Sequence, residues 1–343
     1  MQSLTLNEID PLQDSRWSDL TARSSRSSIF HSPEWLEALR QTYGFRPVVF
    51  TDSGPGEPLR NGLLFCHVES WLTGGRLAGL PFSDHCEPIV DTPELLAPFL
   101  ESLKPLVGPD CRYIELRPLD TTIDAQGFTA TSVFCAHSID LQPDLETIFD
   151  RFHKNHTQRA IRKAERSGQT VEMGRSLELL HDFYALHTMT RRRHGVPVQP
   201  FCWFRNLVDC LGDRLTIYLA RYEGRPVAAI LTASHKKTLV FKYGCLNPAY
   251  KRYGGTPQLF WRAIEDAKQQ GLALFDLGRS DVENHGLAAF KDHLGARRQQ
   301  LTYYRYAVVP HRGWVTAVGT AIFALTPPSV QSRLSSRLYK HFG

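Results

Sequence analysis

The chain has 343 residues, enough for two domains that each bury a core of their own. Its hydrophobic fraction of 42% and charged fraction of 22% are ordinary for a globular protein, and a formal net charge of +5 is by itself weak evidence for an anionic partner. Seven cysteines without a CxxC pair favour reduced thiols, and no run approaches the ~20 apolar residues that cross a bilayer. The N-terminal MQSLTLNEIDPLQDSRW lacks a signal-peptide pattern, so we expect a cytoplasmic protein.

The first half of the chain predicts one α/β domain. A helix begins at the cap Ser32-Pro33-Glu34 and ends at Gly44. A second helix is expected over residues 94–106. Strands are expected near residues 47–51, 62–69, 76–80, 112–116 and 131–141.

The second half repeats this order of elements. Helices are expected over residues 177–193, 201–211, 256–270 and 286–294, and strands over 215–222, 226–234, 238–246, 272–277 and 300–309. We interpret the chain as a pseudo-repeat of one α/β domain, with the catalytic features in the second copy. The predicted domains are residues 1–145 and 146–310, followed by an amphipathic basic tail, 311–343.

Residues 237–291 carry the strongest local signals for a site. A buried strand leads into a basic loop with two glycines, and Thr256 and Pro257 fit the cap and first position of a helix. A second strand then runs into the polar residues Asp276 and Arg279. A right-handed crossover makes the two strands parallel, and ligands favour their carboxyl ends and the N-terminus of the helix between them.

A cationic stripe lies between the two copies. It consists of Arg159, Arg162, Lys163 and Arg166, which fall on one face of a helix. The opposite face is expected to hold Phe149, Phe152, Ala160 and Ala164. The stripe is either a solvated face or the contact for an anionic group such as phosphate, which the arginine fork suits.

Three other parts of the sequence give weaker indications of a functional site. Asp84, His85 and Cys86 are adjacent on an extended segment and point to opposite faces, which favours a loop or substrate contact over a Cys/His nucleophile. His153 and His156 share a helix face, but no further ligand pattern accompanies them, so we expect no metal. The basic, partly apolar tail either packs on a domain or contacts an anionic membrane surface at the inner face of the membrane.

Six segments together resemble a known family. They are FHSPEWLEAL, LPFSDHCEP (80–88), RAIRKAERSG (159–168), TRRRHGVPVQP (190–200), FDLGRSDVENHGLAAFK (275–291) and LGA (294–296). From about Phe30 to Tyr306 the chain is similar to the Fem-type aminoacyltransferases and the related CelD-like acyltransferases, a branch of the GNAT superfamily.

The resemblance implies an α/β fold of two tandem GNAT-like domains, with mixed, largely antiparallel sheets and a splayed parallel strand pair. It implies acyl transfer to an amine or hydroxyl of a cell-envelope or exopolysaccharide precursor. The acceptor would be a phosphorylated or lipid-linked sugar or muropeptide. The chain lacks the long helical hairpin of some Fem proteins, which favours acyl-CoA as donor; the alternative is an aminoacyl-tRNA, the one case with a nucleic-acid partner. A third alternative is a non-catalytic binding protein for polysaccharide assembly.

The resemblance also suggests roles for residues. Tyr253, Gly254, Gly255 and Thr256 take the place of the GNAT pyrophosphate loop, and Phe290-Lys291 matches the Fem-type pair whose lysine steadies the reacting carbonyl. Donor and acceptor are expected to meet near Tyr243, Asp276, Arg279 and Lys291. Asp276 is either a base or amine-orienting group or a structural partner of Arg279. Lys291 is either catalytic or a surface lysine that pairs with Asp292 or Glu283. The expected substrate contacts are Arg159, Arg162, Lys163, Arg166, Tyr243, Asp84 and His85.

Overall fold

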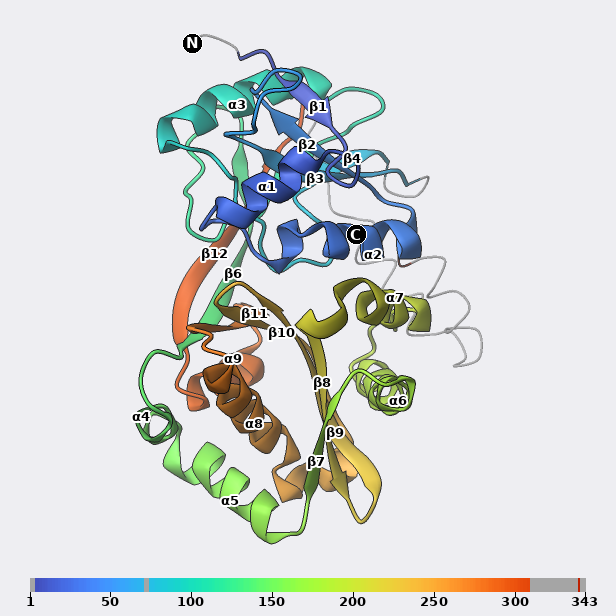
Figure 1. The fold of residues 1–343 in the computed structure, drawn as a ribbon, viewed down its shortest axis with the longest axis vertical. Helices are drawn as coiled ribbons and strands as arrows, with labels where there is room; N and C mark the ends of the chain where they lie inside the picture. Colours follow the sequence, from blue (N-terminus) through green and yellow to red (C-terminus); the bar gives the residue numbers. More distant parts are fainter. Residues whose placement is uncertain (1–3, 71–73, 309–338, 340–343) are drawn as a thin grey trace. The chain divides into compact units, whose positions relative to one another are not determined.

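The computed structural model describes residues 4–70, 74–308 and 339. By their contacts the described residues form two compact units. Unit 1 holds residues up to 133 and from 300 onward, and unit 2 holds residues 134–299. Each unit has helices packed on a mixed sheet, as Figure 1 shows.

Unit 1 contains a sheet with strand order β1-β2-β3-β4-β5-β12-β6. Its strands are β1 (Asn7–Ile9), β2 (Arg46–Thr51), β3 (Leu63–Val68), β4 (Arg76–Ala78), β5 (Ile114–Leu116), and parts of β6 (Thr129–Asp140) and β12 (Arg297–Tyr306). Its helices are α1 (Ser15–Arg23), α2 (Pro33–Tyr43), α3 (Leu96–Leu103) and the 3₁₀ turns η1 (Ile29–His31), η2 (Pro93–Leu95) and η3 (Lys104–Leu106). The predicted cap of α2 is confirmed, because Ser32 accepts a hydrogen bond from the Trp35 N–H and Gly44 ends the helix at φ +71°.

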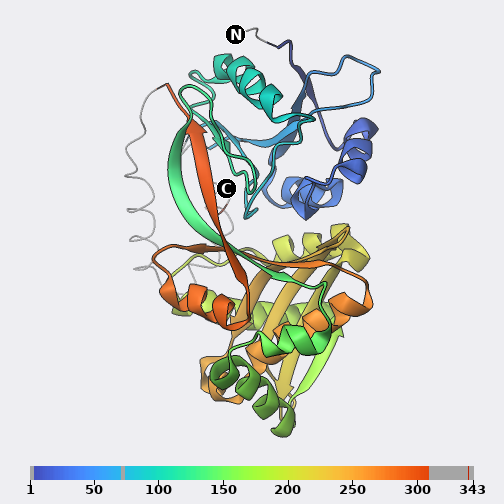
Figure 2. The ribbon, with the colours of Figure 1, turned by 90° about the vertical axis from the view of Figure 1, so that its left-hand side faces the viewer.

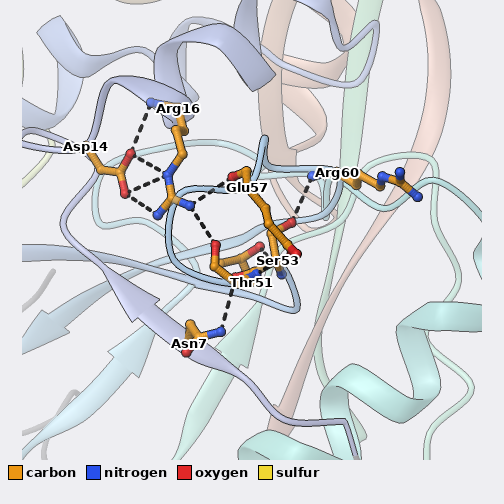
Figure 3. A network of polar contacts seen from close by, with 8 residues as sticks. Asn7, Asp14, Arg16, Thr51, Ser53, Glu57 and Arg60 are labelled. Atoms are coloured by element: carbon orange, nitrogen blue, oxygen red, sulfur yellow. Dashed lines mark hydrogen bonds and ion pairs between the residues drawn. The ribbon is translucent and has the colours of Figure 1, made fainter.

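Arg16 fixes the loop between β2 and β3 to the start of α1, as Figure 3 shows. Its Nε donates to the Asp14 carboxylate at 2.9 Å, and its Nη1 donates to the carbonyls of Gly54 and Glu57, each at 2.9 Å. The same network includes Asn7, Thr51, Ser53 and Arg60. A charged side chain thus satisfies loop carbonyls that no strand reaches.

Unit 2 contains a sheet with strand order β6-β11-β10-β9-β8-β7. Its other strands are β7 (Thr170–Gly174), β8 (Leu215–Tyr222), β9 (Arg225–His235), β10 (Thr238–Leu246) and β11 (Leu274–Asp281). Its helices are α4 (Leu145–Asp150), α5 (Arg159–Arg166), α6 (Leu177–Arg193), α7 (Phe201–Leu211), α8 (Gly255–Gln269), α9 (His285–His293), the π turn η4 (Lys154–Gln158) and the 3₁₀ turns η5 (Gly212–Arg214) and η6 (Pro248–Tyr253). Figure 1 shows α5, α8 and α9 on one face of this sheet and α6 and α7 on the other.

The core of unit 2 forms around α8. The residues predicted to line its buried face are all buried: Leu259, Phe260, Ala263, Ile264 and Ala267. They pack against the α8-facing side chains of the sheet, among them Phe275 and Leu277 of β11. The apolar spacing of 256–270 therefore predicted this helix and its orientation correctly.

The two units exchange their last strands. β6 follows β5 in the chain but pairs antiparallel with β11, whereas β12 follows β11 but pairs antiparallel with β5. In unit 1 the start of β6 runs beside β12, and Figure 2 shows both strands. The predicted boundaries, 1–145 and 146–310, place residues 134–140 in the first domain and residues 300–306 in the second. In the structure, residues 134–140 belong to unit 2 and residues 300–306 to unit 1.

Each unit has one parallel strand pair joined through a helix, which fits the predicted pseudo-repeat. β4 and β5 flank α3 in unit 1, and β10 and β11 flank α8 in unit 2. The predicted tail, 311–343, lies outside the described residues apart from Tyr339. Among the helices of the described residues, none is both long and apolar enough to cross a membrane.

His187 is a buried histidine between α6 and α7. Its Nε2 lies 2.9 Å from Gln199 Oε1, and its ring packs against Phe183, Phe204 and Tyr243. Burial lowers the pKa of His187 to about 4, although the bond to Gln199 acts in the opposite direction. The ring is therefore neutral in the folded protein at neutral pH.

This pKa predicts an acid-labile fold. His187 takes up a proton near pH 6.5 in the unfolded state but only near pH 4 in the folded state. The free energy of unfolding therefore falls as the pH drops from about 6.5 to about 4. Between pH 7 and pH 5 the loss from His187 is about 2 kcal/mol, measured as the free energy of unfolding in urea. His187→Gln keeps a side-chain N–H donor and removes the titrating ring, so it should flatten this pH dependence, whereas His181→Gln, at an exposed position of α6, should not. An equally steep acid slope in His187→Gln would contradict the assignment.

Candidate functional site

The parallel pairing of β10 with β11 stops part-way along the strands. Only Thr238–Val240 pair with Leu274–Asp276. Beyond that point β10 stays paired with β9 to Leu246, and β11 stays paired with β6 to Asp281, with a register shift in each strand. The two strands therefore diverge while each keeps its outer neighbour. This is the splayed parallel pair that the resemblance implied.

A pocket of about 540 Å³ lies beside the diverging strands, entirely within unit 2. Its apolar wall includes Phe241 of β10, Phe260 of α8 and Phe290 of α9, whose rings pack at centroid distances of 4.9 and 5.5 Å. Its cationic residues are Arg193, Lys251 and Lys291. The pocket is thus an apolar slot with cations in its lining, a combination that suits an anionic molecule with an apolar part.

The N-terminus of α8 forms one end of this pocket. The helix begins at Gly255, with Gly254 as its cap at φ +78°. A Cβ on Gly254 would lie 2.3 Å from the Ala160 carbonyl oxygen, so only glycine allows this approach to α5. The prediction that Thr256 caps the helix was wrong, because Thr256 already lies in the first turn.

The first turn of α8 presents unpaired donors. Thr256 Oγ1 is buried without a hydrogen-bond partner, and within the described residues the N–H groups of Gly255 and Thr256 have no acceptor. Thr256 and Gly254 line the pocket, whereas the Tyr253 ring does not and instead stacks on Tyr222 at 4.4 Å. Such a helix N-terminus with an orphaned hydroxyl fits the phosphate groups of a bound molecule.

Lys291 is buried in the pocket lining, with only 2% of its surface exposed. Its Nζ donates to the carbonyl oxygens of Gly278 at 3.0 Å and Arg279 at 2.9 Å. These carbonyls belong to the part of β11 that no longer pairs with β10. The interpretation of Lys291 as a surface lysine is therefore wrong, and its ammonium ties α9 to the bulged strand.

Asp276 and Arg279 flank the same bulge. Asp276 is 7% exposed, and its Oδ1 accepts a hydrogen bond of 2.7 Å from the Gly278 N–H, where the backbone turns at φ +67°. The Arg279 guanidinium lies over the Phe134 ring at 4.1 Å from its centroid. Neither side chain lines the pocket. The structure thus brings Asp276, Arg279 and Lys291 together around one bend of β11.

Tyr243 packs with α6 and α7. Its hydroxyl accepts a hydrogen bond of 2.8 Å from Trp203 Nε1, and its ring contacts Phe204 and His187. Phe241, two positions earlier, lines the pocket with α8. Tyr243 therefore lies on the opposite face of the sheet from the pocket, beside the same divergence of strands.

The cationic stripe is exposed along α5. Within the described residues none of Arg159, Arg162, Lys163 and Arg166 forms an ion pair. The Arg162 guanidinium lies over the Phe149 ring at 5.5 Å. The predicted opposite face was wrong in part: Ala164 is buried on α5, but Phe149 belongs to α4 and Phe152 to the segment between the helices. Tertiary packing, and not one helix, supplies that face.

Asp84 and His85 belong to unit 1, whereas the pocket lies in unit 2. The Asp84 carbonyl accepts a hydrogen bond of 2.6 Å from the Tyr303 hydroxyl, and His85 is buried with its ring against Phe30. Cys86 Sγ lies 3.5 Å from His31 Nε2, so its histidine neighbour is a residue that the sequence did not suggest. Burial raises the pKa of the Cys86 thiol to about 12, which argues against a nucleophilic thiolate.

Sequence reasoning missed several residues of the pocket. Arg193 and Thr190 at the end of α6 line it, as does His293 at the end of α9. The TRRRHG segment marked the first two as part of the resemblance, but no local pattern connects them with α8. His293 has no sequence signal, because its neighbours in space, His153 and His156, lie far away in the chain.

Comparison with known proteins identifies the unit that holds the pocket. The model of an acetyltransferase (GNAT) domain matches residues 151–292, which include every residue of the pocket lining except His293. Residues 151–292 are a GNAT acyltransferase domain. A search of curated proteins finds no match.

Solved structures extend the likeness to both units. FemX has a TM-score of 0.68 at 13% identity, over 92% of this chain and 100% of FemX. A tandem GNAT protein from the clavulanic acid biosynthesis pathway has a TM-score of 0.56 at 10% identity, over 90% and 100%. The C-terminal domain of a putative lysylphosphatidylglycerol synthetase from Agrobacterium fabrum has a TM-score of 0.52 at 13% identity, over 90% and 94%. At such identities the likeness concerns the fold, which is the predicted tandem GNAT-like fold.

Proposed function

We propose that the protein transfers an acyl group from acyl-CoA to an amine or hydroxyl of a cell-envelope or exopolysaccharide precursor. The observation that carries this proposal is the row of unpaired donors at the N-terminus of α8, which opens on the 540 Å³ pocket beside the diverging strands. The diphosphate of CoA suits those donors and the lysine of the preceding turn, Lys251. The apolar wall of the pocket suits the uncharged arm of CoA.

The chemistry requires only direct transfer. The amine or hydroxyl of the acceptor attacks the acyl carbonyl, the new C–N or C–O bond forms, the thioester C–S bond breaks, and the thiol leaves. Asp276 is the candidate that takes the proton or orients the nucleophile, and Lys291 is the candidate cation beside the developing oxyanion. Positioning of the two substrates supplies the rest.

An aminoacyl-tRNA donor and a muropeptide acceptor form the second candidate, favoured by the likeness to FemX over its full length. A binding protein without activity is the third. The deciding experiment incubates the purified chain with a panel of acyl-CoAs and, in parallel, with charged tRNAs, together with phosphorylated and lipid-linked sugars. Release of free CoA thiol that depends on an acceptor supports the proposal. If the acyl group is transferred from charged tRNA alone, acyl-CoA is not the donor. If no transfer occurs from either donor, the proposal that the protein is an acyltransferase of this kind is wrong.

Thr256→Val tests the donor site. The change removes an orphaned hydroxyl at nearly constant volume, so stability without donor should stay equal or rise. Affinity for acyl-CoA should fall about tenfold, the loss expected for one hydrogen bond to a charged group. Calorimetric titration measures this, and Thr256→Ser, which keeps the hydroxyl, is the matched control. Equal affinity in wild type and Thr256→Val would contradict phosphate binding by this residue.

Lys291→Met tests the oxyanion role. The carbonyls of Gly278 and Arg279 lose their donor, so the free energy of unfolding should fall by about 1–3 kcal/mol. Turnover at saturating substrates should fall about 10²–10³-fold, as when one oxyanion donor is lost. Lys291→Arg keeps a cation and distinguishes the loss of stability from the loss of turnover. Compared with Lys291→Met, it should recover more of the free energy of unfolding than of the turnover rate. A folded Lys291→Met variant with turnover within about threefold of wild type would exclude catalysis by Lys291.

The cationic stripe is proposed to bind phosphate of the acceptor. Arg162→Gln/Arg166→Gln should weaken acceptor binding and reduce its dependence on salt, because phosphate contacts are lost. The control Arg225→Gln/Arg297→Gln removes the same charge from exposed positions outside α5. Acceptor affinity is measured by titration at two salt concentrations. If both double variants behave like wild type, the stripe is a solvated face.

A further inference from the structure

Three histidines from two distant segments meet at the pocket. His153 caps the turn η4, His156 lies within it, and His293 ends α9. The three ring centroids are 4.5–4.6 Å apart in every pair, and one nitrogen of each ring lies within 4.8 Å of one nitrogen of each other ring. His156 and His293 also line the pocket. The reason for expecting no metal, the lack of a third ligand, therefore no longer holds.

Backbone contacts hold the two segments together without help from the rings. The His153 N–H donates to the His293 carbonyl at 2.9 Å, and Thr157 Oγ1 donates to the same carbonyl at 2.8 Å. The chain leaves α9 at Gly295, with φ +69°, where a Cβ would lie 3.0 Å from Arg151 Cβ. Glycine thus permits the close approach of the end of α9 to the segment before η4. The ligand-bearing backbone is fixed in advance, which reduces the entropy lost on binding.

The ring nitrogens have few competing partners. Within the described residues, one hydrogen bond reaches them, from the His156 N–H to His153 Nδ1 at 3.3 Å, which is long and therefore weak. No carboxylate forms an ion pair with any of the three rings in that part of the chain; the nearby Asp292 carboxylate is bonded to Arg298. Neutral imidazoles with available lone pairs are metal ligands.

We propose that His153, His156 and His293 bind one divalent transition-metal ion of the class that imidazole prefers, such as Zn²⁺. Zn–N bonds of about 2.0–2.1 Å require the rings to move closer by small side-chain rotations. Three histidines leave a fourth position for water or for an oxygen of a bound molecule. The ion links η4 to the end of α9, the helix that carries Lys291, and so fixes one wall of the pocket.

The experiment uses the full chain without a polyhistidine tag, stripped with a chelator and titrated with Zn²⁺ by calorimetry. Wild type should bind one ion per chain and melt at a higher temperature with Zn²⁺ than without it. His156→Ala and His293→Ala should each weaken binding more than about 100-fold, since loss of an outer hydrogen-bond partner of a ligand already costs about 10–100-fold. Co²⁺ in place of Zn²⁺ should give the visible absorption of a four-coordinate ion, and both variants should lose it.

His285→Ala is the matched control, because His285 is an exposed histidine at the other end of α9 and outside the cluster. It should bind Zn²⁺ like wild type. Melting curves without metal show whether His156→Ala and His293→Ala still fold, since the backbone bonds between the segments remain in both. No saturable binding of Zn²⁺ to wild type, or affinity in the folded variants within about threefold of wild type, overturns the proposal.

Discussion

The end of the pairing between β10 and β11 after Val240 and Asp276 is the constraint on which the rest of the site depends. Each strand remains bonded to its outer neighbour, so beyond this point each strand is unpaired only on the side that faces the divergence. It also removes partners from carbonyls of β11, and those of Gly278 and Arg279 accept hydrogen bonds from Lys291. A hydrogen-bond donor is thereby required at this bend of β11, and the ammonium of Lys291 supplies it from the lining of the pocket.

Two walls of the pocket are positioned by close backbone approaches that only glycine permits. At Gly254 the loop before α8 passes the Ala160 carbonyl, and at Gly295 the chain after α9 passes Arg151. The first approach sets where α8 begins and therefore which donors remain unpaired. The second sets where α9 ends and therefore which side chains meet η4. In both cases the segment that approaches comes from the region between residues 151 and 160, so this short region positions two walls of the pocket.

Local patterns predicted the elements that local physics determines. The cap at Ser32, the buried face of α8 and the strand–helix–strand crossover each depend on spacing or turn chemistry within one segment. The features that the sequence missed all depend on contacts between distant segments. Gly254 caps α8 because of Ala160, Cys86 faces His31, β6 and β12 pair across the repeat, and His293 joins His153. Spacing along the chain contains no information about such neighbours.

Helix α9 connects the bulge of β11 with the cluster of three histidines. Lys291 anchors it to the bulge of β11, and the His293 carbonyl anchors it to His153 and Thr157, two residues further along. Asp292 lies between them and pairs with Arg298 on β12. A helix of nine residues held at three consecutive positions has little freedom to shift. The position of the Lys291 ammonium is therefore coupled to the contacts of His293, and an ion bound by the three histidines acts on the bulge of β11 through this helix.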